Sequence, residues 1–262
     1  MSISKFLVAV FLLSSLSIDA VAQQASDEEG AARRVDTDEV ILVAGATGQT
    51  GSRVVQQLKS LGYKNILAMT RNKERAISKF GSDIEWIEAN VTEPESLQKA
   101  FQGVDRIIST IGSSREPGNG TEAVEYLGVK NMVDAAIDND VKILVLTSSA
   151  GITDEDNELN RILDNVLIWK FKGEEYLRGS GLNYSIVRSG GLKPNIPGGQ
   201  FGVYFSQNDD SRAGQISVDD VASVLIEAAN NPDAHGKTYE TFNYVTRYPA
   251  AWPGTFAFLE KD

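Results

Sequence analysis

The sequence predicts an α/β fold, a Rossmann-type doubly wound parallel sheet in a single domain. Two observations favour this fold class. The apolar run Val40–Ala44 enters a Gly-x-x-Gly-x-x-Gly turn and is followed by an amphipathic segment at helical spacing. Strand-like and helix-like stretches then alternate about every 20 to 30 residues, which is typical of parallel strands joined by right-handed crossovers. The expected strand order is 3-2-1-4-5-6, with the ligand at the carboxyl ends of the strands.

The first half of the chain supplies four of the expected strands. A helix around Ser52–Leu58 follows the glycine turn, and the second strand and a charged helix are expected at 65–69 and 72–80. Residues 84–87 alternate as a third strand. Proline is favoured in a first helical turn, so the next helix is expected to open at 93–97. The fourth strand is expected at 105–109.

The second half continues the alternation. A longer helix at 121–138 leads to the strand 142–146, which is apolar enough to be buried on both faces. The remaining expected elements are a helix over about 159–178, a strand at 184–187, a helix beginning at Ser217 and a late strand near 237–242.

The glycine turn is the most specific candidate site. Free backbone N–H groups and the positive end of the following helix dipole would meet there, which suits a phosphate. Gly45 allows the tight turn, Gly48 the close approach of a pyrophosphate, and Gly51 close packing of helix on strand. A plain strand–turn–helix corner is the alternative. The dinucleotide interpretation predicts contacts from Gly45, Thr47, Gly48, Gln49, Thr50 and Gly51.

The end of the second strand bears on the choice of nucleotide. An acidic residue there would bind the ribose hydroxyls of NAD. This chain has Thr70-Arg71-Asn72-Lys73 instead. Arg71 either pairs with a 2′-phosphate or is a solvated surface arginine. Its position favours NADP over NAD as the cofactor.

Three further strand ends carry polar or small residues. Asn90 and Val91 follow the third strand, where an amide can meet the adenine. Thr110 and Gly112 follow the fourth strand, where small residues let the backbone pass near a cofactor. Ser148 closes the fifth strand, where a hydroxyl can contact substrate or nicotinamide. Each is a turn residue in the alternative interpretation, but their shared location favours a site.

The N-terminus has the order of a secretory signal peptide. In residues 1–22, Lys5 precedes an apolar run at 6–13 and a small-residue end, Ala20-Val21-Ala22. The alternative is a membrane anchor, but the run is short for a span, so we expect cleavage and no stable membrane span afterwards. We expect residues 23–38 to be a flexible linker and residues 39–262 to form the NAD(P)-binding domain. We therefore expect export to a periplasm, to the outside, or along an endomembrane route that includes an ER-routed plastid.

The composition excludes several classes of function. The full chain has a net charge of −11, which argues against a nucleic-acid partner because phosphate binding needs a basic face. It has no cysteine, so disulfides, thiol catalysis and thiolate metal sites are excluded. His235, the only histidine, and the acidic run 154–156 are expected at the surface, and no metal site is expected.

The glycine turn, the strand end 148–151, residues 174–192 and the segment 216–222 together match one known family. They resemble the atypical short-chain dehydrogenase/reductases, in particular their NAD(P)H-binding, NmrA-like branch. The resemblance covers Val40 to about Phe242. It implies a Rossmann domain that binds NADP(H) and often reduces small carbonyl compounds or quinones, although some members bind the dinucleotide without known chemistry. The family's Arg-Pro-Gly after the sixth strand is Arg188-Ser189-Gly190 here.

The resemblance also points to a departure in catalysis. Hydride-transferring relatives use Tyr-x-x-x-Lys on the helix after the fifth strand, where tyrosine donates a proton and lysine lowers its pKa. Aligning on Glu174 places the lysine at Lys170 and leaves Val166 at the tyrosine position, while choosing Lys172 leaves Ile168 there. Neither Val166 nor Ile168 can donate a proton.

The remaining candidates for the reaction are few. Tyr176 and Tyr184 lie out of register with the missing tyrosine. Lys170 either holds the ribose or is a solvated helix lysine, and Ser148, water or a group on the substrate would take the proton role. The glycine–proline loops 112–120 and 190–199 are either substrate lids or plain loops.

Two functions therefore stay open. The first is an NADPH-dependent reductase of a small carbonyl or quinone acceptor. The second is a non-catalytic NADP(H)-binding sensor or assembly factor.

The aromatic tail 242–258 is expected to cover an edge of the core. Neither the substrate nor the oligomeric state follows from the sequence.

Overall fold

The structure, a computed structural model, describes residues 38–207, 209, 214–245 and 252–262. The expected signal peptide at 1–22 and the linker at 23–38, except its last residue, lie outside these ranges. Within them, no helix is both long enough and apolar enough to cross a membrane.

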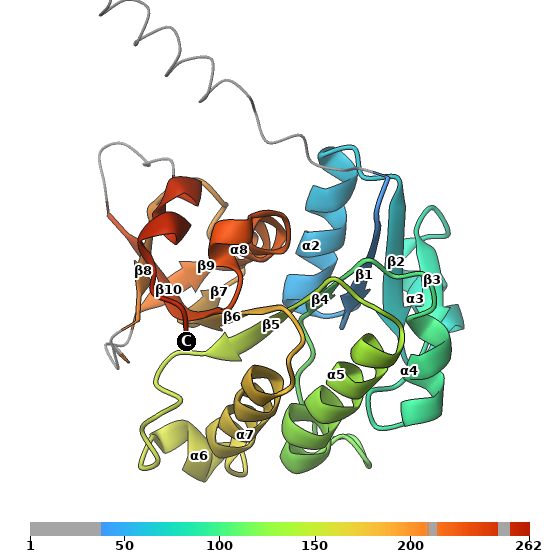
Figure 1. The fold of residues 1–262 in the computed structure, drawn as a ribbon, viewed down its shortest axis with the longest axis horizontal. Coiled ribbons are helices and arrows are strands. Elements are labelled where there is room, and N and C mark those ends of the chain that lie inside the picture. The colour runs from blue at the N-terminus through green and yellow to red at the C-terminus, as the bar shows by residue number, and fades with distance from the viewer. Residues whose placement is uncertain (1–37, 208, 210–213, 246–251) are drawn as a thin grey trace, which may run out of the picture. The chain divides into compact units, whose positions relative to one another are not determined.

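The described part of the chain forms one large sheet in the order β3-β2-β1-β4-β5-β6-β10-β8 (Figure 1). Neighbouring strands run parallel, except that β8 runs antiparallel to β10. The predicted order 3-2-1-4-5-6 is confirmed, and β10 and β8 extend it beyond β6. The strands are β1 (Val40–Ala44), β2 (Asn65–Thr70), β3 (Glu85–Glu88), β4 (Arg106–Ser109), β5 (Ile143–Ser149), β6 (Tyr184–Ser189), β8 (Gly202–Ser206) and β10 (Lys237–Tyr244).

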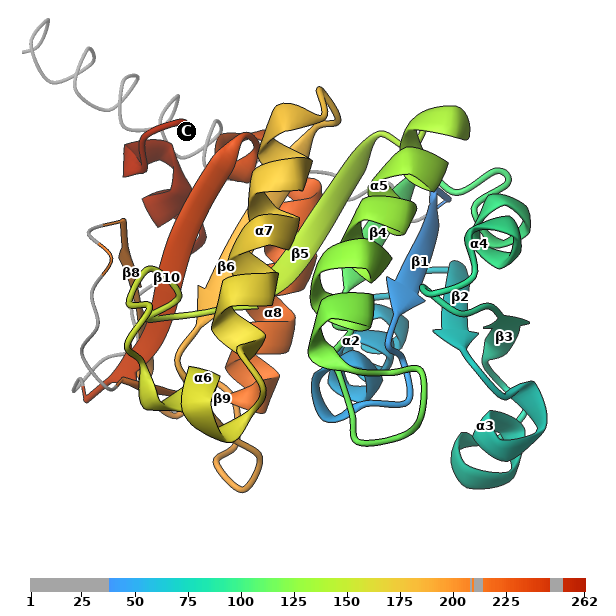
Figure 2. The same cartoon turned by 90° about the horizontal axis from the view of Figure 1, so that it is seen from below.

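Helices cover both faces of this sheet, as expected for a doubly wound fold (Figure 1). One apolar cluster holds Val54 of α2 (Gln49–Ser60), Ala76 of α3 (Lys73–Phe80) and Leu225 of α8 (Val218–Asn230). A second cluster holds residues of α4 (Pro94–Ala100), α5 (Val129–Asp138) and α7 (Val166–Gly179), which Figure 2 shows in front of the sheet. The central strands contribute to both clusters because their side chains alternate between the two faces.

Two helices differ from the prediction. The helix expected at 121–138 begins with a π-helical segment, η1 (Glu122–Gly128), before α5. The helix expected at 159–178 is divided into α6 (Glu158–Ile162) and α7, because Asp164 and Asn165 adopt left-handed backbone conformations. The buried Asn160 side chain accepts hydrogen bonds from the backbone N–H groups of Leu167 and Ile168 at the start of α7. This capping stabilises the break.

Three short strands were not predicted. β7 (Gly191–Lys193) and β9 (Gln215–Ser217) pair in parallel as a small second sheet, and β7 lies in the segment expected to be a loop. Strands of three residues are too short for an alternating pattern to be recognised. β8 forms because its backbone pairs with β10, a partner about 35 residues away in the chain, so no local pattern indicates it.

A buried ion pair lies within residues 174–192, one of the segments that resemble the family. Arg188 in β6 contacts Glu174 in α7 at 2.8 Å, and the side chains are 8% and 0% exposed. Arg178 contacts the same carboxylate at 3.2 Å. These contacts join α7 to β6, so α7 is fixed against the sheet beside the predicted site.

Candidate functional site

The turn between β1 and α2 is fixed by close backbone contact. Gly45 has a φ of +77°, which favours glycine, so its predicted role in a tight turn is confirmed. A Cβ on Gly51 would lie 2.3 Å from the Gly45 carbonyl oxygen and 2.6 Å from Thr110 Oγ1. The Thr110 hydroxyl donates to the Ala44 carbonyl oxygen at 2.8 Å. The first turn of α2 is therefore held directly against the ends of β1 and β4.

The N-terminus of α2 is well suited to an anion. Gly48 precedes the helix without a side-chain cap, and the first turn contains no acidic residue. The first N–H groups of an α-helix have no partner within the helix, and the helix dipole adds a partial positive charge there. This end of α2 lies at the carboxyl edge of the sheet, toward which β1 and β2 point in Figure 2.

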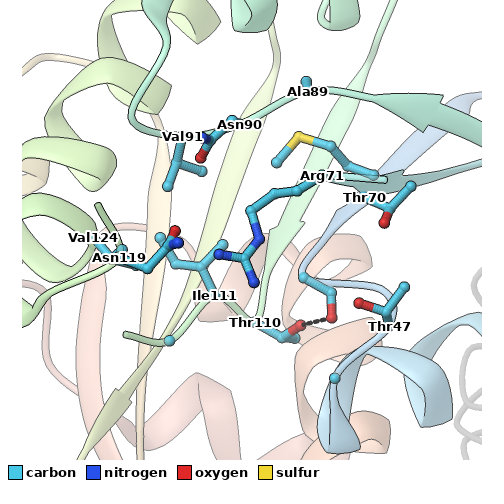
Figure 3. Close-up of a pocket in the computed structure, with 14 residues that line it drawn as sticks. Thr47, Thr70, Arg71, Ala89, Asn90, Val91, Thr110, Ile111, Asn119 and Val124 are labelled. Atoms are coloured by element: carbon cyan, nitrogen blue, oxygen red, sulfur yellow. Dashed lines mark hydrogen bonds between the residues drawn. The ribbon is translucent and has the colours of Figure 1, made fainter. Parts of the chain in front are cut away.

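A recess of about 180 Å³ lies beside the turn and is lined by eight of the predicted site residues. In Figure 3 the Arg71 side chain extends between Asn90 and Val91 on one side and Thr47 and Thr110 on the other. Asn90 is not free, because its amide N–H donates to Glu93 at 3.2 Å and its oxygen accepts from the Thr92 N–H. The lining residues are Gly45, Thr47, Gly48, Met69, Thr70, Arg71, Ala89, Asn90, Val91, Thr110, Ile111, Gly112, Asn119 and Val124.

Arg71 also lines a second recess of about 280 Å³, together with Arg75 and Lys79 of α3. The sequence interpretation included only Arg71. Arg75 and Lys79 are four residues apart in α3 and share one helical face, and this spacing could have identified them as a basic pair that follows Arg71. Arg71 pairs at 2.9 Å with Glu116 of the 112–120 loop, and both side chains are about half-exposed.

A cavity of about 690 Å³ lies at the carboxyl ends of β4, β5 and β6. It shares Thr110, Ile111 and Gly112 with the first recess, so the two hollows adjoin at the end of β4, and we refer to them together as the cleft. Gln49 and Thr50 line this cavity and not the first recess. Apolar side chains in its wall include Ile111, Leu159, Leu192 and Phe242.

Two hydroxyls at the end of β5 are buried in this cavity wall without a partner. Thr147 Oγ1 and Ser148 Oγ make no hydrogen bond to the described residues, and Ser148 is 5% exposed. A buried hydroxyl without a partner costs free energy, typically about 1 to 3 kcal/mol. A polar group of a ligand that reached either hydroxyl would remove this cost.

Lys170 of α7 also lines the cavity, and its Nζ lies 2.7 Å from Glu125 Oε2. The alternative that Lys170 is a solvated helix lysine is wrong, because the side chain is 18% exposed and paired with a buried carboxylate. Lys172 is exposed and lies over the Trp169 ring at 4.2 Å, beside a different hollow. Of the two lysines considered, only Lys170 reaches the cavity.

No tyrosine takes the place of the missing proton donor in the cavity lining. Val166 is buried in a small apolar cluster with Ile152 and Leu167. The Tyr176 hydroxyl donates to Asp134 at 2.6 Å, on the side of α7 that faces α5. Burial and nearby Asp262 raise the pKa of Tyr184 to about 12, and its hydroxyl donates to Asp262 at 3.0 Å.

Two other candidates from the sequence, His235 and residues 154–156, do not line the cleft. His235 is half-buried rather than on the surface, and its Nδ1 lies 3.1 Å from Asn183 Nδ2. Residues 154–156 are exposed. Among the described ranges, no group of three or more acidic or histidine side chains is arranged to hold a metal ion. Of the aromatic tail, Trp252 and Phe256 pack on Phe205 in the core as expected, Tyr244 and Phe258 are exposed, and Tyr248 lies outside the described residues.

The segment 216–222 fixes the loop that borders the cavity. The buried Asp220 side chain accepts from the Gly199 N–H at 2.7 Å and from Asn243 at 2.9 Å. Ser217 caps α8 and donates to the Ile196 carbonyl oxygen at 2.6 Å. The loop 190–199 is thus fixed at its far end, while its first residues form β7.

Comparison with known proteins identifies relatives of the whole domain. A family model described as NAD(P)H-binding matches residues 45–232. An uncharacterized chloroplastic protein of Arabidopsis thaliana is 34% identical, over 81% of this chain and 80% of its own. Sanguinarine reductase of Eschscholzia californica is 28% identical, over 76% of this chain and 87% of its own. The chloroplastic protein TIC 62 of Arabidopsis thaliana is 33% identical over 74% of this chain, which spans only 34% of TIC 62.

Solved structures show the same fold. A protein of Bacillus halodurans, provisionally assigned as an NAD-dependent epimerase/dehydratase, has a TM-score of 0.72 and 26% identity, over 84% of this chain and all of its own. A short-chain dehydrogenase/reductase of Veillonella parvula in complex with NADP has a TM-score of 0.63 and 18% identity, over 81% of this chain and 99% of its own.

Replacing Gly51 by alanine should weaken dinucleotide binding at the glycine turn. The new Cβ would lie 2.3 Å from backbone, so α2 must move away from β1. We expect affinity to fall at least about tenfold, or about 1.4 kcal/mol, in a fluorescence titration. Gly179→Ala is the matched control because a Cβ there meets nothing within 4 Å. Unchanged binding by Gly51→Ala would show that the ligand does not use this turn.

Proposed function

Because the chain belongs to the NAD(P)H-binding, NmrA-like family of atypical short-chain dehydrogenase/reductases, we propose that it is an NADPH-dependent reductase of a small carbonyl or quinone acceptor. One observation carries this proposal. The cleft beside the glycine turn continues into a cavity of about 690 Å³ that contains Lys170 and the unpartnered Ser148 hydroxyl. A dinucleotide bound along this edge would bring its nicotinamide to a chamber large enough for a second molecule.

The residues of the cleft fit the cofactor. The space that a Cβ would fill at Gly51 is taken by backbone, which places the uncapped start of α2 where a pyrophosphate would bind. We propose that Asn90 and Val91 contact the adenosine, and that Thr110 and Gly112 line the path between the adenosine and the pyrophosphate. The residues that would bind the pyrophosphate are Gly45, Thr47, Gly48, Gln49, Thr50 and Gly51. When bound, NADPH supplies a hydride. Lys170 would donate a hydrogen bond to the nicotinamide ribose.

The proposed reaction assigns a polar role to Ser148. The apolar wall formed by Ile111, Leu192 and Phe242 suits a ring or short chain, and the Ser148 hydroxyl can donate to its carbonyl oxygen. That hydrogen bond would stabilise the negative charge that develops on the oxygen during reduction. The proton comes from water or is relayed through Ser148, because Val166 cannot provide it.

Ser148→Ala tests this role directly. NADPH consumption should be measured with a panel of quinones and carbonyl compounds. We expect the wild-type protein to consume NADPH faster than Gly51→Ala. Ser148→Ala should lower kcat on the order of 10- to 100-fold while NADPH affinity changes little. Turnover by Ser148→Ala at the wild-type rate would remove Ser148 from the reaction.

We further propose NADP(H) as the preferred nucleotide. Arg71 and Arg75 both line the recess beside β2, where a 2′-phosphate would replace Glu116 as the partner of Arg71. Arg71→Ala and Arg75→Ala should each weaken NADPH binding about tenfold and change NADH binding less than about threefold. Lys73→Ala is the control, since it removes a charge from the same helix outside the recess. Equal losses for NADPH and NADH would contradict the preference.

The alternative function is a non-catalytic sensor or assembly factor. The buried Val166 at the position of the usual proton donor favours it, and TIC 62 is a relative with this domain in a longer protein. Tight NADPH binding without reduction of any acceptor would support this alternative over the reductase.

We propose a plastid as the compartment, reached along the endomembrane route that the leader suggests. The support is that relatives such as the uncharacterized Arabidopsis protein and TIC 62 are chloroplastic. A fluorescent protein fused after Asp262 should co-localise with the plastid, and deletion of residues 1–22 should leave the fusion in the cytosol. Secretion of the full-length fusion into the medium would contradict this proposal.

A further inference from the structure

Glu125 is a buried acid beside the cleft that the proposed reaction does not yet use. It lies in the π-helical segment η1 and is 2% exposed. Its Oε2 lies 2.7 Å from Lys170 Nζ, and its Oε1 accepts from the Ser113 backbone N–H at 2.6 Å. One carboxylate thus joins the lysine of α7 to the start of the 112–120 loop.

The backbone fixes this contact. A Cβ on Gly173, less than one turn after Lys170, would lie 2.4 Å from the Glu125 carbonyl oxygen. Glycine therefore allows α7 and η1 to touch, and it places Lys170 opposite Glu125. π-helical turns occur frequently at functional sites, because the wider turn redirects a side chain.

Lys170 can bind a second group while its ammonium contacts Glu125. An ammonium has three N–H donors, and the contact with Glu125 uses one of them. Lys170 also lines the large cavity, so its remaining donors can face that side. A buried charge needs a partner, and Glu125 has two donors on its two oxygens. The pair is therefore suited to hold the lysine in one orientation.

We propose that Glu125 is a positioning residue. Its carboxylate, which also accepts from the Ser113 N–H, fixes the Lys170 ammonium at the nicotinamide-ribose end of the cleft. This inference rests on the proposed function. It predicts that loss of the carboxylate affects the nicotinamide half of the cofactor and leaves the adenosine half unaffected, because the adenosine recess is lined by other residues.

Glu125→Gln is the informative variant. The amide has the same shape but offers one acceptor oxygen and an NH₂ donor, so either Lys170 or the Ser113 N–H would face a donor. We expect the Kd for NADPH to rise about tenfold and the Kd for 2′,5′-ADP, which lacks the nicotinamide half, to stay within about twofold. Glu125→Asp keeps both acceptors and should recover part of the NADPH affinity.

Two further measurements separate positioning from a loss of folding. Lys170→Met should give the same pattern, and Glu125→Gln combined with Lys170→Met should be no weaker than Lys170→Met alone, because both act through one contact. Asp38→Asn is the matched control, since it removes the acid of the exposed Lys64–Asp38 pair before β2. It should change neither affinity.

The outcomes are distinct. Parallel losses of NADPH and 2′,5′-ADP binding in Glu125→Gln, additive effects in the double variant, or NADPH affinity within twofold of wild type would each overturn the positioning role. A wild-type protein that binds NADPH but reduces no acceptor would remove the reductase proposal, while the comparison of the two ligands would still decide the role of Glu125. A wild-type protein that binds neither ligand would overturn both.

Discussion

The arrangement of the site depends on one steric constraint, the contact of α2 with the end of β1. Gly51 has no room for a side chain, because the Gly45 carbonyl oxygen and the Thr110 hydroxyl occupy the space. This contact brings an uncapped helix N-terminus to the edge of a parallel sheet, where the dipole and the free N–H groups act together. The same hydroxyl donates to Ala44, so β4 and its following loop are placed relative to the turn. The adenosine recess and the large cavity then lie on either side of that point.

The sequence predicted the parts of this arrangement that follow from local patterns. The strand order follows from alternating apolar strands and helices, and the role of Gly45 follows from the spacing of the glycines. The ends of the strands meet at one edge in any such sheet, so Asn90, Thr110 and Ser148 were placed near the cleft without knowledge of the contacts.

The remaining features depend on pairs of residues that are distant in sequence. The contact of Lys170 with Glu125 joins residues 45 positions apart, and no local pattern indicates it. The same holds for Arg71 with Glu116 and for β8, which forms only against β10. The break before α7 depends on the Asn160 side chain, which replaces the preceding helical turn as partner for two N–H groups. A helical pattern in the sequence does not reveal such a cap.

The domain thus combines the proposed dinucleotide cleft with a chamber whose lining contains no tyrosine among the described residues. Val166 is packed among apolar side chains, so the missing hydroxyl is not supplied from that position. The polar side chains that line the chamber include Ser148, Thr147 and Lys170, and Lys170 pairs with the buried Glu125. Under the proposed function, chemistry at this end uses Ser148, Lys170 and water, whereas binding of the nucleotide uses the glycine turn together with Arg71, Arg75 and Lys170.

A crystal structure of the full chain grown with NADPH would show whether the glycine turn and the large cavity hold one dinucleotide. We expect the pyrophosphate at the start of α2, the adenosine between Arg71 and Asn90, and the nicotinamide in the cavity beside Ser148, with Lys170 at its ribose. A dinucleotide bound elsewhere, or one whose nicotinamide lies outside that cavity, would contradict this arrangement.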